Sequence, residues 1–171
     1  VRSWADFESL AARVAGHLVA AGLGPDDKVA FYLHNGTEYL EATFGAFKAR
    51  CVPVNVNYRY LEAELAYLLD NSDAAAVVVS AELVDRLGAV IGQLPAVRTV
   101  LVVGATDEHP VPDGSTAPWD LAGGVVDYDS AVAAAEPMAR IARSADDLYI
   151  LYTGGTTGMP KGVLWRQHDI F

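Results

Sequence analysis

Short apolar segments alternate with amphipathic ones along the first hundred residues, and this alternation limits the fold more than any other feature. Apolar runs with the length of buried strands cover residues 28–33, 51–56, 75–79 and 99–103. Between these runs, apolar residues recur at the spacing of a helix face. Parallel strands need crossover connections, usually helices. The alternation therefore predicts an α/β fold, in which helices flank a mostly parallel sheet.

Local signals add two helices near the start of the chain. Ser3 can cap the first one, and Asp6 three residues later forms a short variant of the capping box. Thr37 is predicted to cap a second helix. That helix carries an apolar stripe of the kind that amphipathic helices turn toward a core, made of Leu40, Phe44 and Phe47.

The alternation breaks after Gly104. Residues 105–124 are rich in proline and are predicted to form a long surface loop. A modest helix is expected over 127–136 and a last buried strand over 148–152, which runs directly into a segment rich in glycine and threonine. Val163–Trp165 could return as an antiparallel strand. With 171 residues, the chain fits one domain.

Charge and cysteine content restrict the classes of ligand and the cellular compartment that fit this chain. Lys and Arg number 12 against 22 Asp and Glu, and the formal net charge of -10 argues against a nucleic-acid partner. A nucleotide ligand remains compatible, because one local cluster of donors can hold a triphosphate. Cys51 is the single cysteine, and we interpret it as a buried thiol of a protein in the reducing cytoplasm. No apolar run approaches the roughly 20 residues of a transmembrane helix.

The segment 153–162 carries the clearest chemistry. It holds four glycines, three threonines and Lys161 directly after a predicted strand. Glycine lets backbone N–H groups approach an anion, and consecutive N–H groups form an anion-binding nest. Threonine hydroxyls add donors, and Lys161 adds a compact positive charge. The segment is therefore predicted to bind a polyphosphate.

This loop is not a Walker A motif, which needs Gly before its lysine and Ser or Thr after it. Here the neighbours of Lys161 are Pro160 and Gly162. A dinucleotide fingerprint is missing too, because Gly22-Leu23-Gly24 precedes a predicted strand and has Asp27 at the place of the third glycine.

The run Tyr-Thr-Gly-Gly-Thr-Thr-Gly-Met-Pro-Lys-Gly at 152–162 closely resembles the signature of the AMP-forming synthetase superfamily. Acyl-CoA synthetases, luciferases and the adenylation domains of peptide synthetases belong to it. The family usually has Ser at the place of Gly154, a change that removes a hydroxyl and keeps the backbone nest. Segments 24–35, 52–65 and 146–148 are also similar to family motifs, so the resemblance covers nearly the whole chain.

The residues after the loop indicate which branch of this superfamily the chain resembles. Gln167 stands where family members often have the histidine of a Thr-His-x-Asn motif. The variant Trp165-Arg166-Gln167 is similar to a branch of bacterial acyl-CoA synthetases that act on long-chain or steroid-derived acids.

The resemblance implies a reaction in two steps. A carboxylate attacks the α-phosphate of Mg-ATP, which yields an acyl-adenylate and pyrophosphate, and the thiol of CoA then displaces AMP. ATP, Mg²⁺ and CoA are the implied cofactors, and a fatty or steroid-derived acid is the implied partner. The resemblance assigns Lys161 a catalytic role and assigns no metal ligand. It assigns the contacts with the β- and γ-phosphates to Thr153, Gly154, Gly155, Thr156, Thr157, Gly158 and Lys161.

The resemblance also implies that residues 1–171 are the N-terminal part of an adenylation domain. The family's ribose-binding acid and second-domain lysine would then lie downstream, and the fragment alone should not turn over. Because part of its surface would be uncovered, the fragment is expected to self-associate. Two alternatives stay open, namely an adenylation domain that loads a carrier protein and an inactive binding module.

Other polar residues are interpreted as structural. The four histidines lack metal-ligand spacing. The pairs Asp26-Asp27 and Asp146-Asp147 are expected in solvated turns, and Asn57 and Arg59 are expected to fix local structure. Ordering glycines costs backbone entropy. The loop 153–162 is therefore expected to be exposed and more mobile than the strand before it.

Overall fold

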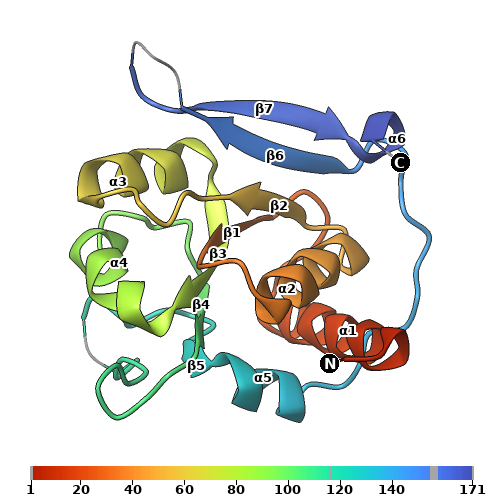
Figure 1. Cartoon of the computed structure of the whole chain (residues 1–171), viewed down its shortest axis with the longest axis horizontal. Helices are drawn as coiled ribbons and strands as arrows, with labels where there is room; N and C mark the ends of the chain where they lie inside the picture. Colours follow the sequence, from red (N-terminus) through yellow and green to blue (C-terminus); the bar gives the residue numbers. More distant parts are fainter. Residues whose placement is uncertain (1, 116, 155–157, 171) are drawn as a thin grey trace.

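The computed structural model describes residues 2–115, 117–154 and 158–170. Helices and strands alternate along the chain as the sequence pattern predicts (Figure 1). The helices are α1 (Trp4–Ala20), α2 (Thr37–Lys48), α3 (Glu62–Asn71), α4 (Val84–Ile91), α5 (Tyr128–Ala134) and α6 (Gln167–Ile170), with a 3₁₀ turn at Ala81–Leu83. The strands are β1 (Lys28–Tyr32), β2 (Val52–Asn55), β3 (Ala74–Ser80), β4 (Thr99–Val103), β5 (Val125–Asp127), β6 (Leu148–Thr153) and β7 (Lys161–Arg166).

The strands form one sheet in the order β5-β4-β3-β1-β2-β6-β7. Neighbouring strands are parallel from β5 to β6, whereas β6 and β7 are antiparallel. The predicted fold class and the antiparallel return after the last predicted strand are therefore confirmed. The chain adds β2 on one side of β1 and then β3 on the other, so strand addition reverses direction at β1.

The helix expected over 127–136 is confirmed as α5, with Asp127 as the N-cap that accepts from Ser130 N–H. The short strand β5 directly before it was not predicted from the sequence. Three residues are too few for a periodic pattern. Their extended conformation comes from pairing with β4, where Val125 lies opposite Val100.

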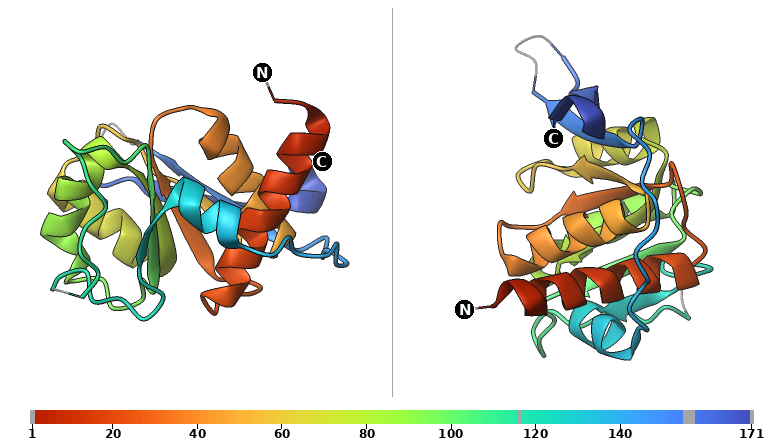
Figure 2. Two further views of the ribbon diagram at one scale, coloured as in Figure 1. Left: turned by 90° about the horizontal axis from the view of Figure 1, so that it is seen from below. Right: turned by 90° about the vertical axis from the view of Figure 1, so that its right-hand side faces the viewer.

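Helices cover both faces of the sheet (Figures 1 and 2). On one face α1, α2 and α5 pack on a buried cluster that includes Leu18, Phe31 and Tyr128. On the other face α3 and α4 pack on a second cluster that includes Leu65 and Leu87. None of the helices in the described part of the chain combines the length and apolar character needed to cross a bilayer.

The cap prediction is confirmed for the first helix and wrong for the second. The Ser3 hydroxyl accepts from Asp6 N–H, and the Asp6 carboxylate accepts from Ser3 N–H, which completes the capping box. The second helix already begins at Thr37, with Gly36 as its N-cap. The Thr37 hydroxyl donates to Glu38 Oε1 instead of capping the helix.

The second helix buries a different face from the one that its apolar stripe predicts. Leu40 and Phe44 are 54% and 42% exposed. A Cβ on Gly45 would lie 2.5 Å from Val14 Cγ1 of α1, so the two helices approach each other too closely for large side chains. The close approach selects small residues and one carboxylate for the buried face, which consists of Glu41, Ala42, Gly45 and Ala46.

Apolar side chains on β7 lead us to expect self-association of this chain. β7 ends the sheet, and Leu164 and Trp165 on it are 62% and 43% exposed. A strand at the edge of a sheet with exposed apolar side chains is a template for pairing with another chain. The molar mass from light scattering should therefore rise with concentration. Leu164→Lys should abolish this rise, whereas Leu61→Lys, at a leucine 55% exposed before α3, should leave it unchanged. A constant monomer mass for the unmodified chain would contradict the expectation.

Candidate functional site

The glycine- and threonine-rich segment connects β6 with β7 (Figure 1). Thr153 and Lys161 are opposite each other as the last residue pair of this antiparallel hairpin. β6 runs parallel to β2, so the segment begins at the same edge of the sheet where the parallel strands end. In open α/β sheets, ligands bind at this carboxyl edge. The topology therefore brings the predicted phosphate-binding residues to the edge where a ligand is expected.

The described residues of the loop leave room for a ligand. Thr153, Gly154, Gly158 and Lys161 are all exposed. A Cβ on Gly154 or Gly158 would meet no atom within 4 Å, and Gly158 has a φ of +156°, a region that favours glycine. Pro160 is buried and anchors the returning end of the loop.

Three of the predicted site residues, Gly155, Thr156 and Thr157, lie outside the described residues. The expectation that the loop is more mobile than the strand before it falls mainly on this part of the chain, and it stays a prediction.

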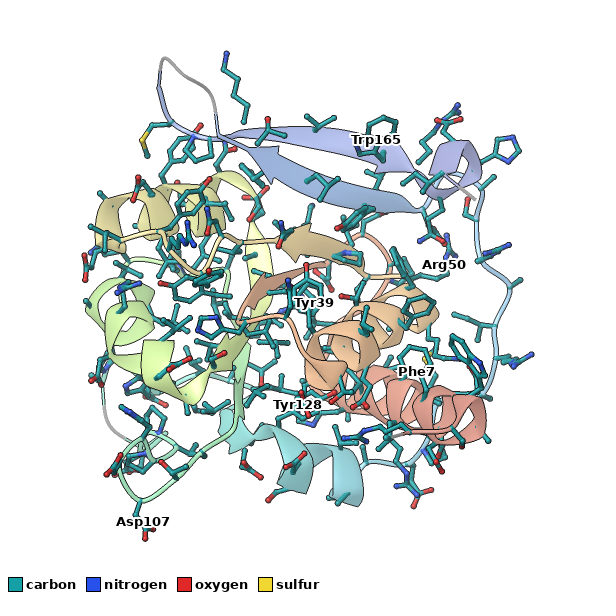
Figure 3. All side chains as sticks on the ribbon, in the orientation of Figure 1. Phe7, Tyr39, Arg50, Asp107, Tyr128 and Trp165 are labelled. Carbon is teal, nitrogen blue, oxygen red and sulfur yellow. The ribbon has the colours of Figure 1, made fainter. Side chains whose placement is uncertain are left out.

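An ion pair supports the strand that leads into the loop. Asp147, expected in a solvated turn, is instead 4% exposed, so that expectation was wrong. Arg50 Nη2 donates to Asp147 Oδ1 at 2.8 Å, and Ser144 N–H donates to Asp147 Oδ2 at 2.9 Å. Figure 3 shows Arg50 beside the start of β6. Asp146, whose side chain is 79% exposed, does fit the expected solvated turn.

The pKa of Asp147 reflects this environment. Burial acts to raise the pKa, but the hydrogen bonds from Arg50 and the Ser144 N–H outweigh it and hold the pKa below its ordinary 3.8. The carboxylate is therefore charged at neutral pH and ties the turn before β2 to the start of β6.

A second turn at the carboxyl edge follows β2, the neighbour of β6. Asn57 Oδ1 accepts from Arg59 N–H at 3.0 Å, which confirms that these residues fix local structure. The Arg59 guanidinium lies 5.5 Å from the centre of the Tyr58 ring. From α4, Arg86 donates to Tyr60 O at 3.1 Å and holds the same turn. The role of Arg86 could not be predicted, because a lone arginine on a helix carries no local signal of its distant partner.

Cys51 is buried, as interpreted from the sequence, whereas the histidines differ in environment: Nε2 of His17 is buried without a partner among the described residues. His34 Nε2 lies 2.7 Å from Glu82 Oε1 on the surface. Within residues 2–115, 117–154 and 158–170, no group of three or more His, Cys, Asp or Glu side chains is arranged to hold a metal ion.

Cys51 is fully buried, and burial raises the pKa of its thiol to about 12, which makes it unreactive at neutral pH.

A cavity of about 470 Å³ opens between α2 and the segment 138–143, away from the loop. Its lining includes Phe44, Arg50 and Gln167, and no residue of the described part of 153–162. Gln167, which the resemblance places where such proteins often have a histidine, is 6% exposed. We place the candidate site at the loop and not at this cavity, because exposed glycine N–H groups and a lysine are what a polyphosphate requires.

Comparison with known proteins identifies a matching family and several similar proteins. A family model described as AMP-binding enzyme matches residues 2–171. The medium/long-chain-fatty-acid–CoA/3-oxocholest-4-en-26-oate–CoA ligase of Mycobacterium marinum is 45% identical over 174 residues, which cover 99% of this chain and 30% of that protein. The 3-oxocholest-4-en-26-oate–CoA ligase of Rhodococcus rhodochrous is 42% identical over 170 residues, with coverage of 99% and 29%. The chain thus spans about 30% of the length of the curated relatives it matches.

Solved structures share the fold. The anthranilate CoA ligase AuaEII in complex with anthranoyl-AMP has a TM-score of 0.84 at 22% identity, over 96% of this chain and 30% of that one. At this identity the likeness shows the fold alone. ATP-bound MatB from Rhodopseudomonas palustris has a TM-score of 0.75 at 30% identity, with coverage of 96% and 29%.

Proposed function

The chain belongs to the family of AMP-binding enzymes, and on this basis we propose that the protein containing it is an ATP-dependent acyl-CoA synthetase. Such an enzyme activates a carboxylic acid as an acyl-adenylate and then transfers the acyl group to the thiol of CoA. The part described here would supply the loop that binds the β- and γ-phosphates of ATP.

The observation that carries the proposal is the β6–β7 hairpin at the carboxyl edge of the sheet. Thr153 and Lys161 face each other at its end, and the described glycines between them are exposed with open space around them. Backbone N–H groups, a hydroxyl and an ammonium group are the donors that bind phosphate oxygens. These residues therefore fit a polyphosphate. We assign its contacts to Thr153, Gly154, Gly155, Thr156, Thr157, Gly158 and Lys161.

In the first step, a carboxylate oxygen of the substrate forms a bond to the α-phosphorus of ATP. The bond between that phosphorus and the bridging oxygen breaks, and pyrophosphate leaves with the electron pair. Negative charge grows on the leaving group, and a fixed positive charge beside it stabilises the transition state. Lys161 is proposed to supply this charge, while the N–H groups of the loop keep the β- and γ-phosphates in place.

In the second step, the sulfur of CoA forms a bond to the acyl carbon and its proton passes to solvent, while the bond between the acyl carbon and the phosphate oxygen breaks and AMP leaves with the electron pair. We assign no residue of this chain to that step. Mg²⁺, when bound with the nucleotide, would neutralise part of the phosphate charge.

Relatives suggest the class of acid. The names of the Mycobacterium marinum and Rhodococcus rhodochrous relatives specify 3-oxocholest-4-en-26-oate, and the first also specifies medium- and long-chain fatty acids. We therefore propose a fatty or steroid-derived carboxylic acid as the substrate of the protein that contains this chain.

Exchange of radiolabelled pyrophosphate into ATP tests the proposal in the full-length protein. Exchange should occur with a long-chain fatty acid or 3-oxocholest-4-en-26-oate and should be absent without an acid. Addition of CoA should then yield acyl-CoA and AMP. Exchange without acyl-CoA formation would favour a carrier protein as the acceptor. No exchange with any carboxylic acid would contradict adenylate formation.

A further inference from the structure

Tyr152, the residue directly before the proposed phosphate loop, has an unusual neighbour across the hairpin. It lies opposite Gly162, and the next pair is Thr153 and Lys161, where the loop begins and ends. Any shift of the Tyr152–Gly162 pair would therefore move both ends of the loop.

Gly162 makes room for the ring of Tyr152. A Cβ at Gly162 would lie 3.1 Å from Cζ and 3.2 Å from Cε2 of that ring, which is tighter than ordinary van der Waals contact. The ring thus lies close to the backbone of β7, and a side chain at position 162 would force it to shift by a few tenths of an ångström. An aromatic ring over a glycine on an edge strand is a recognised way to pin strand register.

The hydroxyl of Tyr152 fixes the ring at its other end. It donates to Oδ1 of Asn71 at 2.8 Å, and Asn71 is the last residue of α3. The ring also packs against the buried cluster under α3 and α4. Burial raises the pKa of Tyr152, so the hydroxyl keeps its proton and remains a donor at neutral pH.

We propose that Tyr152, Asn71 and Gly162 form a positioning unit that fixes both ends of the phosphate loop relative to the sheet. This inference rests on the proposed function of the loop. None of the three residues needs to touch ATP. The unit acts through Thr153 and Lys161, because it holds the residue pair next to them and ties that pair to a rigid helix.

Preorganised donors bind a ligand better than mobile ones, since less freedom is lost on binding. Loss of the unit should therefore weaken ATP binding. Tyr152→Phe, which keeps the ring and removes the hydroxyl, should raise the KM for ATP about 3- to 10-fold, the range expected for one hydrogen bond. The KM for the carboxylic acid should stay within about 2-fold of its original value.

The chain offers a matched control. The hydroxyl of Tyr128 on α5 donates to Glu41 Oε2 at 3.4 Å, and α5 packs beside β4 and β5, at the other end of the sheet from the hairpin, so Tyr128→Phe removes the same type of bond at a distance. It should leave the KM for ATP unchanged. Asn71→Ala should match Tyr152→Phe, and the double variant should be no worse than either single variant, because both remove one interaction. Additive effects, or an equal rise of KM in Tyr128→Phe, would overturn the proposal.

Hydrogen–deuterium exchange separates this inference from the proposed function. Amides of residues 158–163 should exchange faster in Tyr152→Phe and Asn71→Ala than in the unmodified protein or in Tyr128→Phe, whether or not the protein turns over ATP. Unchanged exchange in both variants would overturn the positioning unit. If the unmodified protein shows no pyrophosphate exchange while amide exchange responds as expected, only the proposed function fails.

Discussion

Replacement of Lys161 by alanine in the full-length protein is expected to lower the rate of adenylate formation by about 10²- to 10³-fold, the range for removing one preorganised electrostatic contact from a transition state. Lys161 is exposed and opposite Thr153 at the end of the hairpin, with no described side chain paired to it by a salt bridge. Its charge is therefore free to act on a ligand. Pyrophosphate exchange under saturating ATP and acid measures the effect.

Two variants control for this result. Lys28 begins β1 and thus lies at the amino edge of the parallel strands, opposite to the loop. Lys28→Ala removes the same charge from the protein and should leave the exchange rate within about 2-fold. Lys161→Arg keeps the charge with a different shape and should retain part of the activity. A rate for Lys161→Ala equal to that of Lys28→Ala would remove Lys161 from the site.

Replacement of Asp147 by alanine is expected to lower the free energy of unfolding by about 3 kcal/mol, the largest stability effect among the substitutions considered. The change would leave Arg50 without its buried carboxylate and the Ser144 N–H without its acceptor. The value lies at the lower end of the range for buried pairs because the Arg50 side chain is 29% exposed. For a domain of this size, Tm should fall by about 6–12 °C.

Asp146 provides the matched control for this prediction. It is the same residue type one position earlier, and its side chain is 79% exposed. Asp146→Ala should change the free energy of unfolding by less than about 0.5 kcal/mol. Equal destabilisation by both substitutions in urea denaturation would show that the Arg50–Asp147 pair contributes little.

The pH dependence of the Asp147→Ala effect follows from the lowered pKa of Asp147. A lowered carboxylate pKa stabilises the fold fully above the unfolded value of about 3.9, and the contribution disappears as the pH falls through the folded pKa. The difference in unfolding free energy between the unmodified protein and the variant should thus be constant from about pH 5 to 7. It should shrink below about pH 4. A difference independent of pH would point to packing as the cause.

Much of the fold could be predicted from the sequence because it depends on local patterns. The strand–helix alternation, the capping box of the first helix and the antiparallel return after the loop are all confirmed. The strand β5 was missed, because three residues show no period of their own. The buried face of α2 was predicted wrongly, because hydrophobicity alone does not reveal how closely another helix approaches.

For the candidate site, the residue types in 153–162 and their place after a strand led to the prediction of phosphate binding, which stays a prediction. The residues that support the loop could not be predicted. Asp147 was interpreted as solvated, and no role was predicted for Asn71, because the role of each residue depends on a partner far along the chain. Arg50 is 97 residues from Asp147, and Asn71 is 81 residues from Tyr152.

The sequence by itself determined most of the segments that become strands and helices, and it holds the residue types on which the proposed anion site rests. These properties arise from backbone propensity, side-chain periodicity and the absence of a Cβ in glycine, all of which act within a few residues. Only the tertiary structure decided the strand order, the face on which α2 packs, the burial of Asp147 and the contact of Tyr152 with Asn71. Each of these depends on which distant surfaces meet, and contacts between distant segments leave no periodic trace in a single sequence.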